Sequence, residues 1–490
     1  MSSSENLTRQ SAPNEDSLFP LPLTSIEKFH WLDHSPDFPN LVFCRIRIDD
    51  RLDKELAESA WRTVIARHPL ARCKVKQDAS GWNWSPENEA QFQWKQFNQT
   101  REKQWNWTPP DSAAKVDSYL GIFCWPASAG VSTTQDSSSP SKVETDCNAE
   151  SVPGWHSEIW FYIHHAIADG VGSCVAINEW MIVYSNLVQG RMPTTGLNRL
   201  DPGRLRNRNR LGLLSWSYLK HLWKQPIALF GAAKFVFRRT DRLMPSGKSD
   251  NNSNDRVFPA ITSQWLTGNI ESRLRHQSKL DSVMVNSLLL ANLFRTLTVW
   301  RTSLGNHHDK DWIRIIVPMS IRQVSDRRLP AANRATVVQI DRQSHELAKG
   351  IKDFVKGIDF EIKVIRAWQL DKIFLIAIRA LAVSKKRLSA AAKNEKSRAM
   401  ALFTNLGSPF RKWERFADRN SADSFFPTPT EIDLVGPIKQ GTPINLNLFM
   451  VGSRMRLSLH YNELIISKSK AEQILVLYCK LLKEELDSDS

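Results

Sequence analysis

In the first part of the chain, the pattern of apolar positions predicts two strands and two helices. Apolar and polar residues alternate in the second half of 41–48, as they do in a half-buried strand. Residues 158–163 are rich in aromatic and β-branched side chains, which favours a buried strand. Apolar residues recur at helical spacing in 53–67 and again in 171–187. These segments therefore predict alternating strands and helices.

A second patterned stretch follows and again mixes the two kinds of element. The expected helices are 285–300, most of 344–396, and 468–485. The expected strands are 312–319, a short one at 403–406, and an antiparallel pair at 445–450 and 454–461. Mixed orders of this kind predict an α/β fold in which helices cover mixed sheets.

Changes in composition divide the chain into four parts. Residues 1–17 are polar and predict a disordered tail. Residues 18–195 form an N-terminal half, within which the Ser- and Thr-rich stretch 127–152 predicts a mobile surface insertion. Residues 196–256 form a basic connector, and residues 257–486 form a C-terminal half. Each half is long enough to bury its own core.

Composition excludes several classes of protein. With 41% hydrophobic and 24% charged residues, the chain is neither collagen-like, nor disordered throughout, nor a disulfide scaffold. No run approaches the roughly 18 apolar residues of a membrane span. The polar start lacks an apolar signal segment, so we expect a cytoplasmic protein. The six cysteines are widely spaced and predict reduced thiols, with no metal site among them.

The net charge of +15, from 66 basic and 51 acidic residues, favours anionic partners. No zinc-finger spacing or RNA-binding strand is visible, so we expect no nucleic acid partner. The stretch 203–242 contains ten Lys or Arg and one Asp, interleaved with Trp and Leu. This pattern is typical of peripheral contact with an anionic membrane, but also of a basic connector packed on the protein surface.

The candidate chemistry lies in the segment His-His-Ala-Ile-Ala-Asp-Gly at 164–170, between a predicted strand and a predicted helix. Adjacent side chains at a strand end point in opposite directions, so one of His164 and His165 can face a cleft while the other faces the core. A neutral imidazole, with an ordinary pKa of about 6.5, can abstract a proton near neutral pH. Asp169 can fix the loop, and Gly170 permits a tight turn or leaves space for a substrate. The alternative is a buried histidine pair followed by an Asp that caps the helix.

This segment resembles the His-His-x-x-x-Asp-Gly active-site motif of the coenzyme-A-dependent acyltransferase superfamily. Its members include chloramphenicol acetyltransferase, the condensation domains of nonribosomal peptide synthetases, alcohol acetyltransferases and bacterial wax ester synthase/diacylglycerol acyltransferases. The resemblance implies two chloramphenicol-acetyltransferase-like α/β halves with an active-site channel between them. It also implies that His165 is the general base, that His164 is largely structural, and that Asp169 forms an ion pair with an arginine.

Further segments are similar to the superfamily in the same order along the chain. Residues 317–322, Val-Pro-Met-Ser-Ile-Arg, followed by Asn333, resemble a Val-Pro-x-x-x-Arg strand with a later Asn. Residues 285–291 resemble a helix start of the wax ester synthase branch, although Ser287 replaces the usual Asp. Residues 404–407 resemble another shared element.

Three residues in these segments are further candidates, each with a structural alternative. Arg322 is the expected partner of Asp169, or else a surface residue at a strand end. Asn286 could contact substrate in the channel, or cap the helix that it precedes. Asn405 could donate to a developing oxyanion, or cap a loop.

The resemblance implies an acyltransferase that moves an acyl group from a thioester to an alcohol, a reaction that needs no bound cofactor and no metal. The acyl-CoA or acyl-carrier thioester is then a substrate, and an acyl carrier protein is a candidate partner. Two alternatives stay open. One is a stand-alone condensation enzyme that forms an amide or ester from carrier-bound acyl groups, and the other is a non-catalytic, membrane-associated binding protein.

Overall fold

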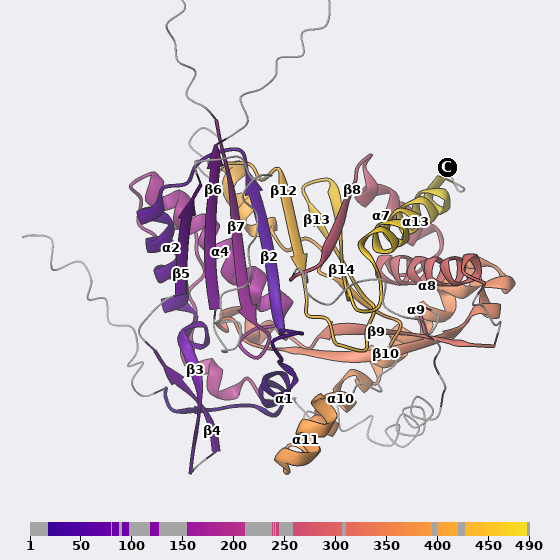
Figure 1. The fold of residues 1–490 in the computed structure, drawn as a ribbon. Helices are drawn as coiled ribbons and strands as arrows, with labels where there is room; N and C mark the ends of the chain where they lie inside the picture. Colours follow the sequence, from indigo (N-terminus) through magenta and orange to yellow (C-terminus); the bar gives the residue numbers. More distant parts are fainter. Residues whose placement is uncertain are drawn as a thin grey trace, which may run out of the picture.

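The computed structural model describes residues 18–79, 81–87, 91–97, 118–126, 154–210, 238, 240, 242–244, 258–305, 310–393, 399–419 and 427–487. The predicted tail 1–17, the insertion 127–152 and most of the connector 196–256 lie outside the described residues. The described chain forms two α/β halves that lie side by side, each built around a mixed sheet (Figure 1).

The first sheet has five strands in the order β12-β2-β7-β6-β5, and every neighbouring pair is antiparallel except β5 and β6. Helices α2 and α4 pack together, and Trp180 of α4 donates its indole N–H to the carbonyl oxygen of Ala57. The elements are β2 (Leu41–Ile48), α2 (Lys54–Arg67), β5 (Gln91–Gln96), β6 (Ser118–Pro126), β7 (Trp155–His164), α4 (Gly170–Val188) and β12 (Glu431–Val435).

The second sheet has six strands in the order β10-β9-β11-β13-β14-β8, in which β11 runs parallel to both of its neighbours. Its core face packs against the long helices α8 and α13 and against α9. The elements are β8 (Ile261–Leu266), α7 (Ile270–Leu280), α8 (Val285–Ser303), β9 (Trp312–Ser320), β10 (Ala335–Gln343), α9 (Ile351–Ala367), β11 (Ala401–Asn405), β13 (Ile444–Val451), β14 (Arg454–Tyr461) and α13 (Lys468–Asp487).

Strand β12 ties the two halves together, because it follows most of the second half in sequence and pairs with β2 of the first sheet. Its Asp433 is fully buried between Arg45 of β2 and Arg456 of β14, whose Nη2 lies 2.7 Å from Oδ1. Burial alone disfavours the charged carboxylate, but the two guanidinium groups lower the pKa of Asp433 to about 2. The carboxylate is therefore an ionic link between the sheets.

A smaller group of elements closes the lower part of the molecule in Figure 1. Its helices α1, α10 and α11 share a small apolar cluster that includes Phe29, Ile378 and Leu388. The elements are β1 (Leu21–Pro22), α1 (Ser25–Asp33), β3 (Cys73–Asp78), β4 (Gly81–Pro86), α10 (Ile373–Leu381) and α11 (Lys385–Ala392), whereas α12 (Arg411–Arg419) packs against α4 of the first half. Short 3-10 helices lie at Pro69–Arg72, Pro202–Asn207, Val324–Arg328, Ser344–Lys349 and Leu370–Lys372.

Within the described part of the connector, Arg208 is a structural residue and not part of a basic surface. Its side chain is buried, and its Nε lies 2.6 Å from Oε1 of Glu27, which is fully buried. Glu27 also accepts the indole N–H of Trp84 and caps α1 together with Thr24. Among the arginines of the basic stretch, Arg208 therefore fits the alternative of a connector packed on the protein and not that of a membrane contact.

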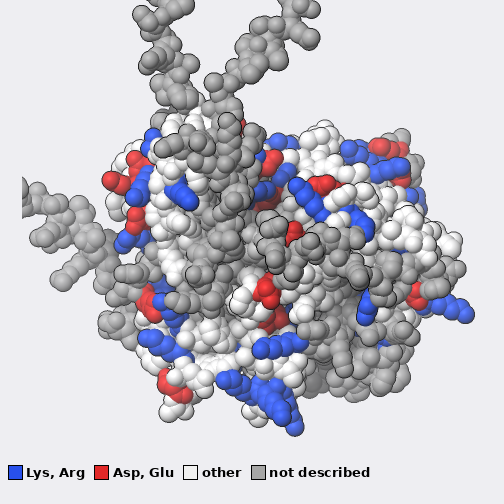
Figure 2. Space-filling view, viewed as in Figure 1, with Lys and Arg blue, Asp and Glu red and all other residues white. Residues whose placement is uncertain are grey.

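We expect the remaining arginines to carry any attraction of this segment to anionic lipid. Replacing them by Gln should reduce binding to vesicles containing phosphatidylserine at low salt, since each basic group near such a surface contributes roughly 1 kcal/mol. The arginines to replace, all at least partly exposed, are Arg204, Arg206 and Arg210. Figure 2 shows a second basic group over α11, and the matched control removes the same number of charges there: Lys385, Lys386 and Arg387. Equal binding by both variants, or none by the wild type, would contradict a membrane role for the connector.

No single helix in the described part of the chain combines the length and the apolar character needed to cross a membrane. The consecutive helices Ile270–Leu280 and Val285–Ser303 reach that length and apolar character only when they are taken together, and their axes are bent by 97°. Both contribute to the second core, where α8 buries Leu290 and Phe294.

Candidate active site

The two adjacent histidines stand at the end of β7, where the strand gives way to the loop before α4. His164 pairs with Leu41 in the sheet register and is fully buried. Its Nδ1 accepts the N–H of Ala166 at 3.0 Å, so its own proton is on Nε2, which lies 3.0 Å from Nδ1 of His34. Both ring nitrogens of His164 are therefore engaged within the protein.

His165 points the other way, into a cavity between the two halves, as the alternation of side chains predicts. Its backbone is held on both sides: its N–H donates to the carbonyl oxygen of Asn40 at 2.8 Å, and its carbonyl oxygen accepts Nδ2 of Asn333 at 2.9 Å. Its ring stacks on that of His30, with centroids 4.2 Å apart and planes inclined by 21°. The imidazole is thereby fixed between α1 and the loop that precedes β10.

Burial lowers the pKa of His165 below its ordinary value, although the charge of Asp169 and a hydrogen bond from the ring to its own backbone carbonyl oppose this. Burial also lowers the pKa of His30 strongly, and the neighbouring charges of His165, Lys439 and His164 lower it further. Both rings are therefore neutral near pH 7. A neutral imidazole that faces a cavity can accept a proton.

Asp169 makes three short contacts that connect the halves. One carboxylate oxygen accepts the N–H of Gly172 at 2.7 Å and thereby caps α4, and the same oxygen lies 2.7 Å from Nη2 of Arg322. The other oxygen accepts the N–H of Arg334 at 2.7 Å. Asp169 thus caps α4, as the structural alternative had it, and also pairs with Arg322, as the resemblance implied.

Two glycines in the first turn of α4 leave room for residues of the second half that pack against it. A Cβ on Gly170 would meet the side chain of Leu406 at 3.2 Å, so this glycine leaves space for a protein side chain, whereas space for a substrate stays a prediction. The tighter position is Gly172, where a Cβ would lie 3.0 Å from the carbonyl oxygen of Ala332 and 3.1 Å from Arg322. Gly172 was not predicted, because the motif ends at Gly170.

The structure does not bring Asn286 to this site. Helix α8 begins at Val285, so Asn286 lies within its first turn and is not the cap. It does not line the cavity that contains His165. The neighbouring Ser287 donates instead to Asp359, which also accepts the N–H of Met284 at the start of α8. The contacts at this end of α8 therefore join it to α9 and not to the cavity.

Asn405 does line the cavity, at the end of β11. Its Oδ1 accepts the N–H of Gly407 at 2.9 Å, which is the loop-capping role that the sequence left open. Its amide nitrogen is the group that remains for a substrate.

Three residues of the site were not identified as such from the sequence: His30, Asn40 and Asn333. The sequence indicates Asn333 only as part of a segment that resembles the superfamily. His30 and Asn40 stand more than 120 residues before His165 in the sequence. The Asn40 amide lies 3.2 Å from Nδ1 of His30, so the two residues form one unit beside His165. Contacts between such distant positions depend on the fold and leave no local signal.

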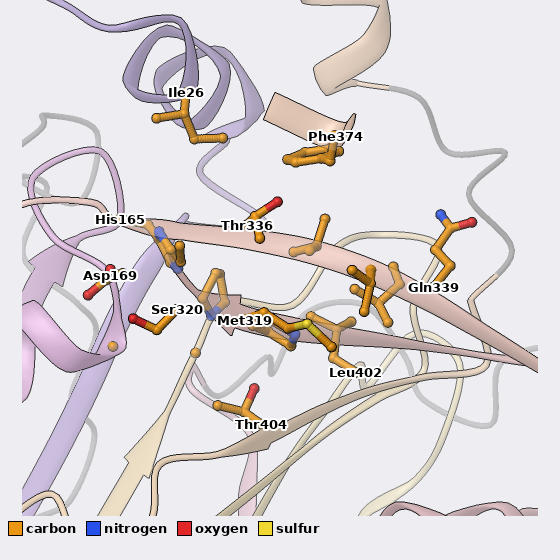
Figure 3. Close-up of a pocket in the computed structure, with 18 of the residues that line it drawn as sticks. Ile26, His165, Asp169, Met319, Ser320, Thr336, Gln339, Phe374, Leu402 and Thr404 are labelled. Atoms are coloured by element: carbon orange, nitrogen blue, oxygen red, sulfur yellow. The ribbon is translucent and has the colours of Figure 1, made fainter. Parts of the chain in front are cut away.

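The cavity has a volume of about 1340 Å³ and lies between α1 and α10 on one side and the second sheet on the other (Figure 3). His165 lies on the left in this view, and Asp169 lies beside it, below and to the left (Figure 3). Apart from the part around His165, most lining side chains are aliphatic or aromatic. Within the described part of the chain, no group of three or more His, Cys, Asp or Glu is arranged to hold a metal ion.

The buried histidines predict a fold that loses stability in mild acid. Burial lowers the pKa of His30, His164 and His165, and lowers that of His460 to about 4. Below about pH 6.5 the unfolded chain binds protons that the folded chain does not, so the free energy of unfolding falls with pH. We expect Tm to drop between pH 7.5 and pH 5, and to drop less in His30→Phe, which keeps a stacked ring. The control His156→Gln, which removes a half-exposed histidine, should keep the full drop, and a Tm that is constant over this range would contradict the prediction.

No family model and no curated protein matches the sequence. Solved structures nevertheless match nearly the whole chain. The first condensation domain of the CDA synthetase has a TM-score of 0.63 at 12% identity, with 95% of this chain and 96% of that chain covered.

Two other solved structures agree. A variant of the starter condensation domain of rhizomide synthetase, in complex with C8-CoA, has a TM-score of 0.60 at 11% identity, with 95% of each chain covered. The EpoB cyclization-docking bidomain from Sorangium cellulosum has a TM-score of 0.61 at 14% identity, with 96% of this chain and 85% of that chain covered. At these identities the similarity concerns the fold alone. The predicted fold class is confirmed: the chain has the mixed α/β, two-subdomain fold of condensation domains.

Proposed function

We propose that the protein is an acyltransferase that moves an acyl group from a thioester to an alcohol, with His165 as general base. The observation that carries the proposal is a neutral, rigidly held imidazole that faces a large cavity between two halves of a condensation-domain fold. The cavity has a volume of about 1340 Å³, and holding both substrates in it would supply the proximity that the reaction needs.

The proposed reaction requires the tautomer of His165 that carries its proton on Nδ1, where the residue's own carbonyl oxygen accepts it, so that Nε2 keeps its lone pair. The amide nitrogen of Asn333 lies 3.0 Å from Nδ1 and, in this tautomer, donates to the carbonyl oxygen of His165 alone. Nε2 takes the proton of the acceptor hydroxyl as that oxygen attacks the thioester carbonyl carbon. The C–S bond then breaks, and the proton passes from Nε2 to the departing sulfur. The products are an ester and a free thiol, with no covalent enzyme intermediate.

The roles of the other site residues follow from their contacts. His164, hydrogen-bonded on both ring nitrogens, positions the strand end that carries His165. Asp169 and Arg322 hold the loop before α4 against the second half. Asn405 is our candidate for a donor to the oxyanion, through its amide nitrogen, and the rate loss of Asn405→Ala measures its share.

A second candidate function is condensation of acyl groups that are bound to separate carrier proteins, with an amine or alcohol as acceptor. The similarity to condensation domains over 95% of the chain favours it. The catalytic step at His165 would be the same, and the difference lies in what delivers the thioester. Acyl-CoA and acyl-carrier donors must therefore be compared directly.

The experiment offers the protein both kinds of donor, acyl-CoA and acyl-pantetheinyl carrier, each with pooled alcohols and pooled amines. Products are identified by mass, and His165→Ala and His156→Ala are assayed beside the wild type. Ester formation from acyl-CoA that requires His165 but not His156 supports the first candidate. Products from carrier donors only would favour the second, and silence with every donor would favour the non-catalytic, membrane-associated alternative.

A further inference from the structure

The cavity extends away from His165 as an apolar arm along the second sheet. Because side chains alternate across a strand, β9 and β11 turn one set of residues into the core and the other toward this space. Ile316 and Leu402 are direct neighbours in the sheet, and Pro318 and Val337 are paired across β9 and β10. All four line the cavity. They form a continuous apolar wall.

The opposite wall is helical and also apolar. Helix α10 presents Phe374, Ala377 and Leu381 to the cavity, and α1 adds Ile26. Figure 3 shows Ile26 and Phe374 facing the sheet residues across the space. The helices are anchored by packing of α1 against α10 and α11, so this wall belongs to the folded structure.

The length of the arm can be followed along β10. It begins beside His165, where Asn333 and Ala335 are joined by a hydrogen bond, and it reaches Gln339 at the far end of Figure 3. The four residue steps from Ala335 to Gln339 span about 13 Å at about 3.3 Å each. With C–C bonds of about 1.5 Å in a zigzag, this distance accommodates roughly ten carbon atoms of an extended chain.

The size of the cavity and the apolar walls of the arm both argue against a small substrate. The whole cavity, of which the arm is one part, has a volume of about 1340 Å³, which exceeds the range of about 300–1,000 Å³ that is usual for small-molecule pockets. The apolar walls lie between His165 and a polar far end, where Gln339, Arg314 and Glu361 line the cavity. A short acyl group such as acetyl would leave most of the apolar surface of the arm in contact with water, and burying that surface is the main source of binding free energy here.

We propose that the apolar arm binds a long aliphatic chain, on the order of ten carbons, whose reacting end lies at His165. The position of the reacting end rests on the proposed function, whereas binding of the chain does not. The chain can belong to the acyl donor or to the alcohol acceptor, and the two sources are separated by experiment. Burying one methylene group contributes about 0.8 kcal/mol, and about 1.36 kcal/mol corresponds to a tenfold change in rate. Each buried methylene should therefore raise kcat/KM up to about fourfold.

The kinetic test varies one chain at a time. Acyl thioesters from two to sixteen carbons are offered with a fixed short alcohol, and alcohols over the same range are offered with a fixed short donor. We expect kcat/KM to rise with length up to about ten carbons in one of the two series. A profile that is flat, or that falls with length, in both series would overturn the proposal while leaving acyl transfer itself intact.

A blocking variant locates the chain. Ala377→Trp fills the arm from the side of α10, and should lower kcat/KM for a ten-carbon substrate at least tenfold relative to a two-carbon one. The matched control is Val383→Trp, which adds a larger side chain just beyond α10 at a position that is 90% exposed. Equal chain-length profiles for the two variants would overturn the assignment of the arm.

A binding measurement separates this proposal from the proposed function. A fluorescent long-chain fatty acid is titrated into the His165→Ala protein and displaced by unlabelled fatty acids of eight to sixteen carbons. We expect displacement to strengthen with chain length up to about ten carbons and to be lost in His165→Ala combined with Ala377→Trp. Binding without turnover in the wild type would contradict the proposed function alone, and absence of binding would contradict the arm as a chain site.

Discussion

Replacing His165 by Ala should lower kcat/KM for acyl transfer by about 10²–10⁴-fold, the range expected when a general base is removed. The ring of His165 faces the cavity and is not part of either core, so its removal should leave the fold in place. The change also removes the stacking of this ring on His30, which is worth about 1 kcal/mol. Steady-state rates and Tm, measured on the same preparation, check both parts of this expectation.

The neighbouring histidine provides the contrast. His164→Ala removes a fully buried ring that is hydrogen-bonded to Ala166 and His34, so it should lower Tm clearly. The half-exposed His156 should tolerate the same change without effect on rate or Tm. A rate near that of the wild type for His165→Ala would remove this residue from the mechanism.

Replacing Asp169 by Asn should lower the free energy of unfolding by about 3 kcal/mol, because it leaves a partly buried Arg322 without its counter-charge. The Asn oxygen can replace only one carboxylate oxygen. The other position becomes an N–H group that faces either Arg322 or the backbone N–H of Arg334, so two donors meet. Urea unfolding of the two proteins measures the difference.

A matched control is the exposed ion pair between Glu58 and Arg62 within α2. Glu58→Gln removes the same charge, but from a solvated pair, and should cost no more than about 0.5 kcal/mol. If Asp169→Asn costs no more than Glu58→Gln, the ion pair between the halves does not stabilise the fold.

The elements that local patterns define well were predicted from the sequence. The expected helix 171–187 is α4, the expected helix 285–300 is α8, and the antiparallel pair near the C-terminus is β13 and β14. Each has one face in a core, so its apolar residues recur with a clear period. The motif at 164–170 was also located correctly between a strand and a helix, because its residues are contiguous.

Three elements with a weaker local pattern were not predicted. Strand β10 lines the cavity with one face and is half-buried along most of its length, which weakens its alternation. Helix α1 is short and largely polar, and buries only Glu27 and Phe29. Strand β12 joins the sheet of the other half, a pairing that no local pattern specifies.

The same distinction applies to the site. The ion pair of Asp169 with Arg322 was anticipated through the resemblance, whereas His30 stacks on His165 because the fold brings α1 beside β7. Asn286 fits a similar motif in sequence, but it lies on a helix that packs away from the cavity. Likewise, the positive charge of Arg208 did not indicate that it is buried, because its partner Glu27 is 181 residues away in the sequence.

The most direct test of His165 as the general base is the pH dependence of kcat/KM in the wild type, which reports the ionisation of the free enzyme. We expect activity to fall in acid with an apparent pKa below about 6.5, since burial lowers the pKa of His165 and only its neutral form accepts a proton. The acid limb should move to still lower pH in Asp169→Asn, because the charge of Asp169 raises the pKa of His165. Residual activity of His165→Ala that keeps the same acid limb would contradict His165 as the base.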